Sequence, residues 1–587
     1  MSEMTGAEMV IAALADQGVE HIFGYPGGAV LPIYDALFQQ KKVQHVLVRH
    51  EQGAVHAAEG YARSTGKVGA VLVTSGPGAT NAVTGLTDAL CDSIPIVAIT
   101  GQVPTHLIGN DAFQECDTVG ITRPCTKYNY LVKSVADLPH VLHEAFHIAS
   151  SGRPGPVVVD IPKDIQFAKG AYFKPTEFHH RGYRPKLKGD ADKIMRAVEM
   201  MAAAKRPLFY TGGGVINSGR RACDLLRELV KLTGFPITST LMGLGAFPAA
   251  DPQWLGMLGM HGTWEANWSM HDCDLMIAVG ARFDDRITGR LDAFSPRSKK
   301  IHIDIDPSSI NKNVKVDLPI VGDCAHVLGD TLRVWRDAGA KPDKNALDAW
   351  WAQIGKWRAK NSLAYRNSNE IIKPQYAIQR LYELTRSVPK DIFITTEVGQ
   401  HQMWAAQFYQ FQEPTRWMTS GGLGTMGYGL PASVGVQLAH PDSLVIDIAG
   451  EASVLMTMQE MSTAVQYDLP IKIFIINNQY MGMVRQWQEL LHGGRYSHSY
   501  TEALPDFVKM AEAYHAHGIR CTHPGELDHK IREMIEVDKP VIFDCVVDPA
   551  ENCFPMIPSG RAHNEMLLGD ATTRVEDAVT EKGKMLV

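Results

Sequence analysis

Short apolar runs alternate with amphipathic stretches along most of the chain, which is the pattern of βαβ units. Apolar runs of strand length include 45–48, 68–75, 207–210 and 471–476. Apolar residues recur at helical spacing in stretches such as 7–17, 191–204 and 220–233. Because strands that alternate with helices pair in parallel sheets, the pattern predicts an α/β fold with mainly parallel strands.

Two segments follow the same order of elements and are interpreted as distant copies of one another. Residues 68–99 comprise a strand, a turn with glycine, a helix and a strand introduced by Pro-Ile, and residues 443–476 repeat this order. Upstream, the segments 59–66 and 428–435 also correspond. Agreement over three consecutive elements predicts two related domains.

A third α/β block lies between the two copies, and the polar stretches 169–190 and 337–344 bracket it. We therefore predict three domains with a linker between the second and the third. Their expected ranges are 1–185, 186–345 and 370–587. The charge-rich segment 574–584 predicts a solvated end, with a C-terminal lid as the alternative.

Composition narrows the classes of function. The 587 residues include 57 Lys and Arg against 64 Asp and Glu, for a formal net charge of −7. This balance predicts no binding to nucleic acid or to an anionic membrane, and no apolar run approaches the roughly 20 residues of a membrane helix. The nine cysteines lack CxxC spacing, and residues 1–4 carry no targeting pattern. We therefore expect reduced thiols and a cytoplasmic location.

The sequence Gly450-Glu451-Ala452, followed after 24 residues by Asn477-Asn478, is the strongest chemical signal. Carboxylate and amide oxygens suit Mg²⁺, and a turn before a helix presents N–H groups to phosphate. An ordinary βαβ turn with a polar exit is the alternative. The motif resembles that of thiamin-diphosphate enzymes, except that Glu451 replaces their Asp. Its arm is one methylene longer, so a weakened Mg²⁺ site is expected. A loop backbone that retreats to seat the Glu is the alternative.

The segment Arg49-His50-Glu51-Gln52-Gly53 follows the predicted strand 45–48. Glu51 could simply pair with Arg49. In thiamin-diphosphate enzymes, however, a Glu of the first domain hydrogen-bonds the pyrimidine ring of a cofactor held by the third domain. On that resemblance we assign Glu51 to the proton transfer that activates the cofactor.

The chain also resembles a narrower family, the catalytic subunits of acetohydroxyacid synthase. The segments that carry this resemblance are 25–29, 49–53, 111–115, 160–164, 280–286, 398–402, 421–426 and 482–488. The resemblance implies two related thiamin-diphosphate-binding domains that flank a Rossmann-like FAD-binding domain, with Mg²⁺ as the third cofactor. It also implies decarboxylation of pyruvate and condensation with pyruvate or 2-oxobutyrate. The products, 2-acetolactate and 2-aceto-2-hydroxybutyrate, feed branched-chain amino-acid synthesis.

The resemblance assigns site residues by position. Thiamin diphosphate is expected at Gly28, Val398, Gly399, Gln400, His401, Met426, Gly450, Ala452 and Ser453. Mg²⁺ is expected at Glu451, Asn478 and the backbone carbonyl of Tyr480. The expected catalytic residues are Glu51, Gln114 and Lys163. The expected substrate channel comprises Ala29, Phe113, Met260, Arg286 and Trp487. Surface ion pairs are the alternative for Lys163 and Arg286.

The middle block resembles the FAD-binding domain of the family. Three glycines after the strand 207–210 can bring backbone close to a dinucleotide, and Arg282 offers a donor fork for phosphate or flavin oxygens. The expected FAD residues are Gly212, Gly213, Gly214, Thr240, Leu241, Met242, His261, Gly280, Arg282, Asp284, Asp304 and Asp323. Asp304 and Asp323 are expected to reach ribose or adenine.

Two other functions stay open on the sequence. A flavin-dependent oxidase of the pyruvate-oxidase kind shares the fold and cofactors, although Trp487 and the segment 280–286 favour the carboligase. A non-catalytic cofactor-binding relative is suggested by Glu451, whereas Glu51 speaks against it and against a glyoxylate carboligase. The resemblance further implies a homodimer at minimum, or a tetramer, with active sites shared between chains and a small regulatory subunit. The choice between the two acceptors is not fixed.

Overall fold

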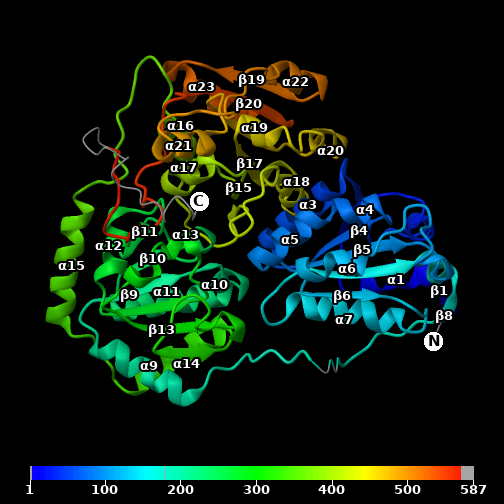
Figure 1. Cartoon of the computed structure of the whole chain (residues 1–587), viewed down its shortest axis with the longest axis horizontal. Helices are drawn as coiled ribbons and strands as arrows, with labels where there is room; N and C mark the ends of the chain where they lie inside the picture. The colour runs from blue at the N-terminus through cyan, green and yellow to red at the C-terminus, as the bar shows by residue number, and fades with distance from the viewer. Residues whose placement is uncertain (1–2, 179, 181, 570–587) are drawn as a thin grey trace.

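Three six-stranded sheets organise the protein, as the computed structural model shows (Figure 1). The structure describes residues 3–569 except 179 and 181, so the predicted end segment 574–584 lies outside the described residues. Neighbouring strands within each of these sheets run parallel. The predicted α/β class is confirmed. A small antiparallel pair joins β1 (Glu3–Thr5) to β8 (Lys169–Ala171).

The first sheet has the order β3-β2-β4-β5-β7-β6. Its strands are β2 (His21–Tyr25), β3 (Gln44–Leu47), β4 (Gly69–Val73), β5 (Ile96–Gln102), β6 (Tyr128–Leu131) and β7 (Val157–Pro162). Its helices are α1 (Gly6–Asp16), α2 (Leu31–Phe38), α3 (Glu51–Thr65), α4 (Pro77–Asn81), α5 (Val83–Asp92), α6 (Thr118–Thr122), α7 (Leu138–Ser150) and α8 (Lys163–Phe167). Every residue of β4, β5 and β7 is buried, because helices cover both faces of a parallel sheet.

The third sheet repeats this topology strand for strand, with the order β16-β15-β17-β18-β20-β19. Its strands are β15 (Ile392–Thr396), β16 (Trp417–Met418), β17 (Leu444–Ala449), β18 (Lys472–Asn477), β19 (His517–Cys521) and β20 (Val541–Val546). Its helices are α16 (Pro374–Thr385), α17 (Gln400–Phe408), α18 (Gly429–Ala439), α19 (Glu451–Val454), α20 (Glu460–Gln466), α21 (Gly482–Leu491), α22 (Phe507–Ala513) and α23 (Leu527–Glu536). The copies read from the sequence occupy corresponding positions, β4 to β5 and β17 to β18, so the prediction of two related domains is confirmed.

The central sheet has the order β11-β10-β9-β12-β13-β14. Its strands are β9 (Pro207–Thr211), β10 (Ile237–Ser239), β11 (Trp254–Met257), β12 (Leu275–Val279), β13 (Lys299–Asp304) and β14 (Leu318–Val321). Its helices are α9 (Ala191–Ala203), α10 (Gly213–Asn217), α11 (Arg220–Thr233), α12 (Trp264–Asp272), α13 (Asp285–Thr288) and α14 (Cys324–Asp337). Counted from its own first strand, this is the 3-2-1-4-5-6 order of dinucleotide-binding folds. The Rossmann-like prediction is confirmed.

The segment expected as a linker differs from the expectation. Helix α15 (Lys344–Arg358) occupies its first half, and the structure buries Trp350, Ile354 and Trp357 in the core of the central domain. Spacings of four and three residues place these side chains on one helical face. The helical period was therefore present in a segment whose polar flanks suggested a linker.

The first and third domains pack directly on each other through α3 and α18 (Figure 1). The two helices approach so closely that a Cβ on Gly60 would lie 2.1 Å from the carbonyl oxygen of Ala432. A Cβ on Gly435 would lie 1.8 Å from the carbonyl oxygen of Ala57. These glycines are therefore required by the contact between the two helices.

The composition predicts reduced thiols and no helix that crosses a membrane. All nine cysteines are free thiols. Within residues 3–569, leaving aside 179 and 181, no helix has both the length and the apolar character needed to cross a membrane.

Candidate active site

A small cavity of about 60 Å³ opens at the carboxyl edge of the third sheet. Strands β17 and β18 are parallel neighbours, so their ends bring Glu451, the first residue of α19, beside Asn478. The predicted residues that line this cavity are Val398, Gly399, Gln400, His401, Met426, Gly450, Glu451, Ala452, Ser453, Asn478 and Tyr480. The spacing of the motif is thus the length of the helical crossover after β17 together with strand β18.

Among the described residues, three buried polar atoms of this cavity lack a protein partner. They are Oε1 of Glu451, whose residue is 1% exposed, Nε2 of His401 and Nε1 of Trp404. Burial raises the pKa of Glu451 to about 8, although backbone groups of Glu451, Asn478 and Tyr480 oppose the shift. Burial lowers the pKa of His401 to about 3, so its ring is neutral and one nitrogen can donate to an anion. An unpaired carboxylate oxygen beside an amide fits a hard divalent cation.

Glycine shapes the wall of the small cavity. A Cβ on Gly450 would lie 2.7 Å from the His401 ring, and a Cβ on Gly399 would meet the same ring at 2.7 Å. Asn478 is held in place because its amide donates to Oε1 of Gln400 at 3.1 Å, and its own Oδ1 accepts from the backbone N–H of Tyr480 at 3.1 Å. The cavity therefore has a fixed arrangement of one carboxylate, one imidazole and two amides.

A larger cavity of about 540 Å³ lies at the carboxyl end of the central sheet. It opens where β9 and β12 lie side by side and the strand order reverses, which is the usual place for a dinucleotide. The predicted residues that line it are Gly212, Gly213, Gly214, Thr240, Leu241, Met242, Met260, His261, Gly280, Arg282, Asp284, Arg286, Asp304, Asp323 and Trp487. Val398 and Met483 line both cavities, so the two adjoin.

Close backbone packing explains two of the three consecutive glycines in this cavity. A Cβ on Gly212 would lie 2.3 Å from the carbonyl oxygen of Gly280, and one on Gly214 would lie 2.7 Å from the Cα of Gly280. Gly280 itself has a φ of +61°, in the left-handed region that favours glycine. The glycines thus let two strand–helix turns meet at the floor of the cavity.

The carboxylates of the large cavity also have structural partners. Asp284 and Asp323 cap α13 and α14, and Asp323 accepts from the Ser218 hydroxyl at 2.7 Å. Asp304 accepts from the backbone N–H of Asp306 at 2.8 Å. The ring of His261 is buried, which lowers its pKa to about 4, and its Nε2 has no partner in the part of the chain that the structure describes. Nδ1 of the same ring bonds to the carbonyl oxygen of Pro555 at 3.2 Å, so Nε2 is the ring atom that can meet a polar group of a ligand.

Six predicted site residues line neither cavity and gather instead at the carboxyl edge of the first sheet. They are Gly28, Ala29, Glu51, Phe113, Gln114 and Lys163. The backbone N–H of Ala29 donates to the Thr74 hydroxyl at 3.3 Å. The backbone of Gln114 packs on Gly76, where an added Cβ would lie 2.7 Å from the carbonyl oxygen of Gln114. Glu51 is buried and accepts from the Asn81 amide at 3.0 Å. Within one chain, the predicted site is therefore divided into two parts.

Several residues at these sites had no signal in the sequence. Arg153 and residues 91–93 of the first domain line the large cavity, although their local sequence is that of an ordinary loop and helix end. Glu460 is 1% exposed and accepts from the backbone N–H of Arg49 at 3.0 Å. It therefore holds the turn that presents Glu51, and burial raises its pKa to about 7. These contacts join different domains, so no local motif indicates them.

The fold and the two cavities define a class of enzyme that the comparisons with known proteins also identify. Three thiamine pyrophosphate enzyme families match, with the N-terminal TPP binding domain at residues 4–121, the central domain at 194–331 and the C-terminal TPP binding domain at 397–545. The chain is thus a thiamin-diphosphate-dependent enzyme.

Full-length relatives narrow the class. The chain is 51% identical to the acetolactate synthase isozyme 3 large subunit of Escherichia coli K12, over 97% of this chain and 99% of that protein. It is 49% identical to the acetolactate synthase large subunit of Haemophilus influenzae, with the same coverage. It is 47% identical to the acetolactate synthase of Mycobacterium bovis, over 99% of this chain and 94% of that protein. The chain belongs to the acetolactate synthase large-subunit family.

Proposed function

We propose that this chain is the catalytic subunit of an acetohydroxyacid synthase, active with thiamin diphosphate, Mg²⁺ and FAD. It decarboxylates pyruvate and joins the remaining two-carbon unit to pyruvate or 2-oxobutyrate. Identity near 50% over almost the whole chain to acetolactate synthase large subunits carries the proposal. The products are 2-acetolactate and 2-aceto-2-hydroxybutyrate, precursors of branched-chain amino acids.

The small cavity takes the diphosphate and Mg²⁺ in this proposal. The free oxygen of Glu451, Oδ1 of Asn478 and the backbone carbonyl of Tyr480 hold the ion, while the neutral ring of His401 donates to phosphate. Thiamin diphosphate supplies the carbanion chemistry that cleaves the bond to CO₂. Met426 lies on the wall of the same cavity, where a bulky apolar side chain supports the ring system of the cofactor.

The large cavity binds FAD in this proposal, and it also contains the channel through which substrates reach the reacting centre. Its position at the strand-order reversal, its glycine floor and the free Nε2 of His261 support a dinucleotide. In this family the flavin is retained without net redox. Met260, Arg286 and Trp487 lie on the wall of the same cavity and are assigned to the channel, where Trp487 packs against the acceptor.

Glu51 is assigned to the proton shared with the pyrimidine ring of thiamin diphosphate. Its carboxylate is buried and one oxygen accepts from Asn81, so it is held in a fixed orientation. Because Glu51 and Glu451 lie in separate parts of one chain, the complete site needs a second copy, whose Glu51 faces the small cavity of the first. Phe113, which is 89% exposed beside Gln114, is the kind of apolar side chain that such an interface covers. A dimer is therefore the minimum, and a small regulatory subunit is a further expected partner.

One assay tests the function against the oxidase alternative. The protein is supplied with pyruvate, thiamin diphosphate, Mg²⁺ and FAD, and acetolactate and oxygen uptake are scored separately. Acetolactate without stoichiometric oxygen uptake is expected. Oxygen uptake that matches pyruvate consumption, with no acetolactate, contradicts the proposal in favour of an oxidase. Absence of both, in a sample that binds all three cofactors, contradicts catalysis.

A further inference from the structure

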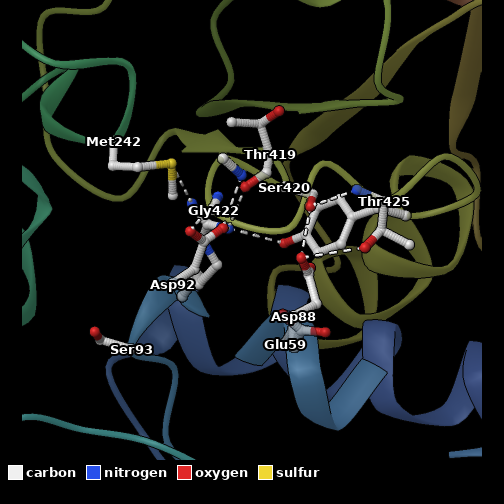
Figure 2. A network of polar contacts seen from close by, with 12 residues as sticks. Glu59, Asp88, Asp92, Ser93, Met242, Thr419, Ser420, Gly422 and Thr425 are labelled. Carbon is white, nitrogen blue, oxygen red and sulfur yellow. Dashed lines mark hydrogen bonds and ion pairs between the residues drawn. The ribbon is translucent and has the colours of Figure 1, made fainter. Parts of the chain in front are cut away.

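Two carboxylates of α5, in the first domain, hold one loop of the third domain (Figure 2). The loop comprises residues 419–425, called here the 419–425 loop. Asp92, the last residue of α5, accepts from the backbone N–H groups of Gly421 at 2.8 Å and Gly422 at 2.7 Å. Asp88 lies one turn earlier on the same helix. It accepts from the hydroxyls of Ser420 at 2.5 Å and Thr425 at 3.3 Å.

The placement of Asp92 is unfavourable unless the loop is present. A carboxylate at a helix C-terminus faces the negative end of the helix dipole, and α5 has no basic residue in its last turn. The Asp92 side chain is only 1% exposed, and burying a charge is costly without partners. Two adjacent N–H groups and Arg63, 3.8 Å away, compensate for both penalties. The loop and the helix end are therefore complementary.

The 419–425 loop is restrained by several further contacts on the side that faces the first domain. Arg63 also donates to the carbonyl oxygen of Thr419 at 2.6 Å, which holds the start of the loop. A Cβ on Gly422 would lie 2.8 Å from Cβ of Cys91, so the backbone already touches α5. Ser420 further accepts from the backbone N–H of Thr425 at 2.8 Å, which closes the loop on itself. Loss of the Asp88 contacts would leave the buried hydroxyls of Ser420 and Thr425 without this acceptor, and loss of the Asp92 contacts would release the part-buried amides of the two glycines.

The same loop forms part of both cavities. Residues 420–424 line the large cavity, and Met426, which follows Thr425 directly, lines the small one. We propose that Asp92 and Asp88 are positioning residues for the two cofactor pockets. Asp92 fixes Gly421 and Gly422 as a wall of the flavin cavity, and Asp88 fixes Ser420 and Thr425 and so sets Met426 in the thiamin diphosphate pocket. The inference rests on the proposed function only in the identity of the two ligands.

The groups around Asp88 indicate which substitution should keep its hydrogen bonds to the loop. Burial and the nearby carboxyl of Glu59 raise the pKa of Asp88 well above its usual range, and burial likewise raises that of Glu59. Burial lowers the pKa of His56, whose ring bonds to Glu59 at 2.9 Å. The protonated form of Asp88 is therefore favoured more than in an ordinary Asp, and one of its oxygens accepts both loop hydroxyls. An Asn side chain keeps an acceptor oxygen and the same shape.

The test compares five variants with the parent protein. Asp92→Ala removes both acceptors of the loop amides, and Asp92→Asn keeps one of them. Ser420→Ala removes the Asp88 contact and the acceptor of the Thr425 N–H from the loop side, without changing α5. Asp88→Asn is the conservative variant. Thr87→Ala is the control on the same helix, because the Thr87 hydroxyl bonds, among the described residues, only to the carbonyl oxygen of Val83, at 2.7 Å.

Three measurements separate the possible results. Hydrogen exchange of the amides at 421 and 422 is measured without cofactors, and FAD and thiamin diphosphate with Mg²⁺ are titrated separately by protein fluorescence. We expect Asp92→Ala to speed loop exchange and to raise the half-saturating FAD concentration at least about tenfold, since two hydrogen bonds to a charged group are lost. Asp92→Asn is expected to show the same changes to a smaller extent. The half-saturating thiamin diphosphate concentration should change less than FAD in both variants.

Ser420→Ala should show the reverse order, with the larger effect on thiamin diphosphate. Asp88→Asn and Thr87→Ala should stay within about threefold of the parent protein for both ligands. Weaker FAD binding with unchanged loop exchange would mean that Asp92 only touches the flavin, and would overturn the inference. Equal losses of both ligands in Asp92→Asn and Ser420→Ala would overturn it as well. If the parent protein binds no FAD, the proposed function fails, whereas the exchange measurement still decides whether Asp92 holds the loop.

Discussion

Replacing Glu451 by Asp tests whether this chain carries a weakened Mg²⁺ site. The carboxylate of Glu451 has one oxygen in the small cavity that meets no partner among residues 3–569, leaving aside 179 and 181. The extra methylene displaces it by about 1.5 Å, one C–C bond, relative to an Asp at the same backbone position. Mg²⁺ requires ligands near 2.0–2.1 Å, and about 0.2 Å is the usual tolerance of a metal site. The displacement is therefore several times larger than the tolerance.

The expected magnitude follows from this mismatch. Disturbing the support of a metal ligand typically changes metal affinity by about 10–100-fold, so Glu451→Asp should lower the half-saturating Mg²⁺ concentration by about tenfold or more. Thiamin diphosphate should bind more tightly with it, because the ion anchors the diphosphate. Folding should respond in the opposite direction. Loss of one buried methylene destabilises the cofactor-free protein by about 1 kcal/mol.

The assay titrates Mg²⁺ and thiamin diphosphate against acetolactate formation and, in parallel, against protein fluorescence. Glu451→Gln is the matched control, because it keeps the length and removes the charge, and it should need more Mg²⁺ than the parent. FAD affinity should be equal in all three proteins, since Glu451 does not line the large cavity. An Asp variant that needs as much Mg²⁺ as the parent, or more, would show that this loop is adapted to Glu and would refute the reasoning.

Three further changes test other parts of the site. Glu51→Gln should lower turnover at least about tenfold while thiamin diphosphate still binds, because acid–base catalysis is lost and the diphosphate anchor lies in another domain; normal turnover in steady-state kinetics would remove Glu51 from this role. Trp487→Leu should reduce the preference for 2-oxobutyrate over pyruvate in a competition assay, since one methyl group in a pocket is worth about 1–3 kcal/mol; an unchanged product ratio would place selection elsewhere. Burial raises the pKa of Glu460 to about 7, from 4.5 for an ordinary Glu, so the folded protein holds this proton more tightly than the unfolded chain. The resulting stabilisation, about 3 kcal/mol, is complete below pH 4.5 and is lost as the pH rises through 7. Glu460→Gln should therefore flatten the fall in unfolding midpoint between pH 5 and 8, and parallel curves for the two proteins would show that Glu460 does not titrate in this range.

Much of the fold and of two pockets could be predicted from the sequence, because the signals are local. The alternation of strands and helices gives the parallel sheets, and the sequence distance from Glu451 to Asn478 is set by one helical crossover and the strand that follows it. Residues that follow neighbouring parallel strands must meet at one edge, so the motif gathers without knowledge of the rest of the chain. The repeated segments likewise predicted two sheets of the same topology.

Only the tertiary structure decided how the domains complete each other's sites. Asp92 meets Gly422 across 330 residues of chain, and Arg153 reaches the central domain's cavity. The structure also places Glu51 and Glu451 in separate halves of the predicted site, and it packs Trp350 of the expected linker into a core. Such contacts arise from the way preformed domains dock, which depends on surface shape and on buried donors and acceptors drawn from distant segments. A local pattern of hydrophobic and polar residues determines the domains themselves, but it contains no information on which of their surfaces meet.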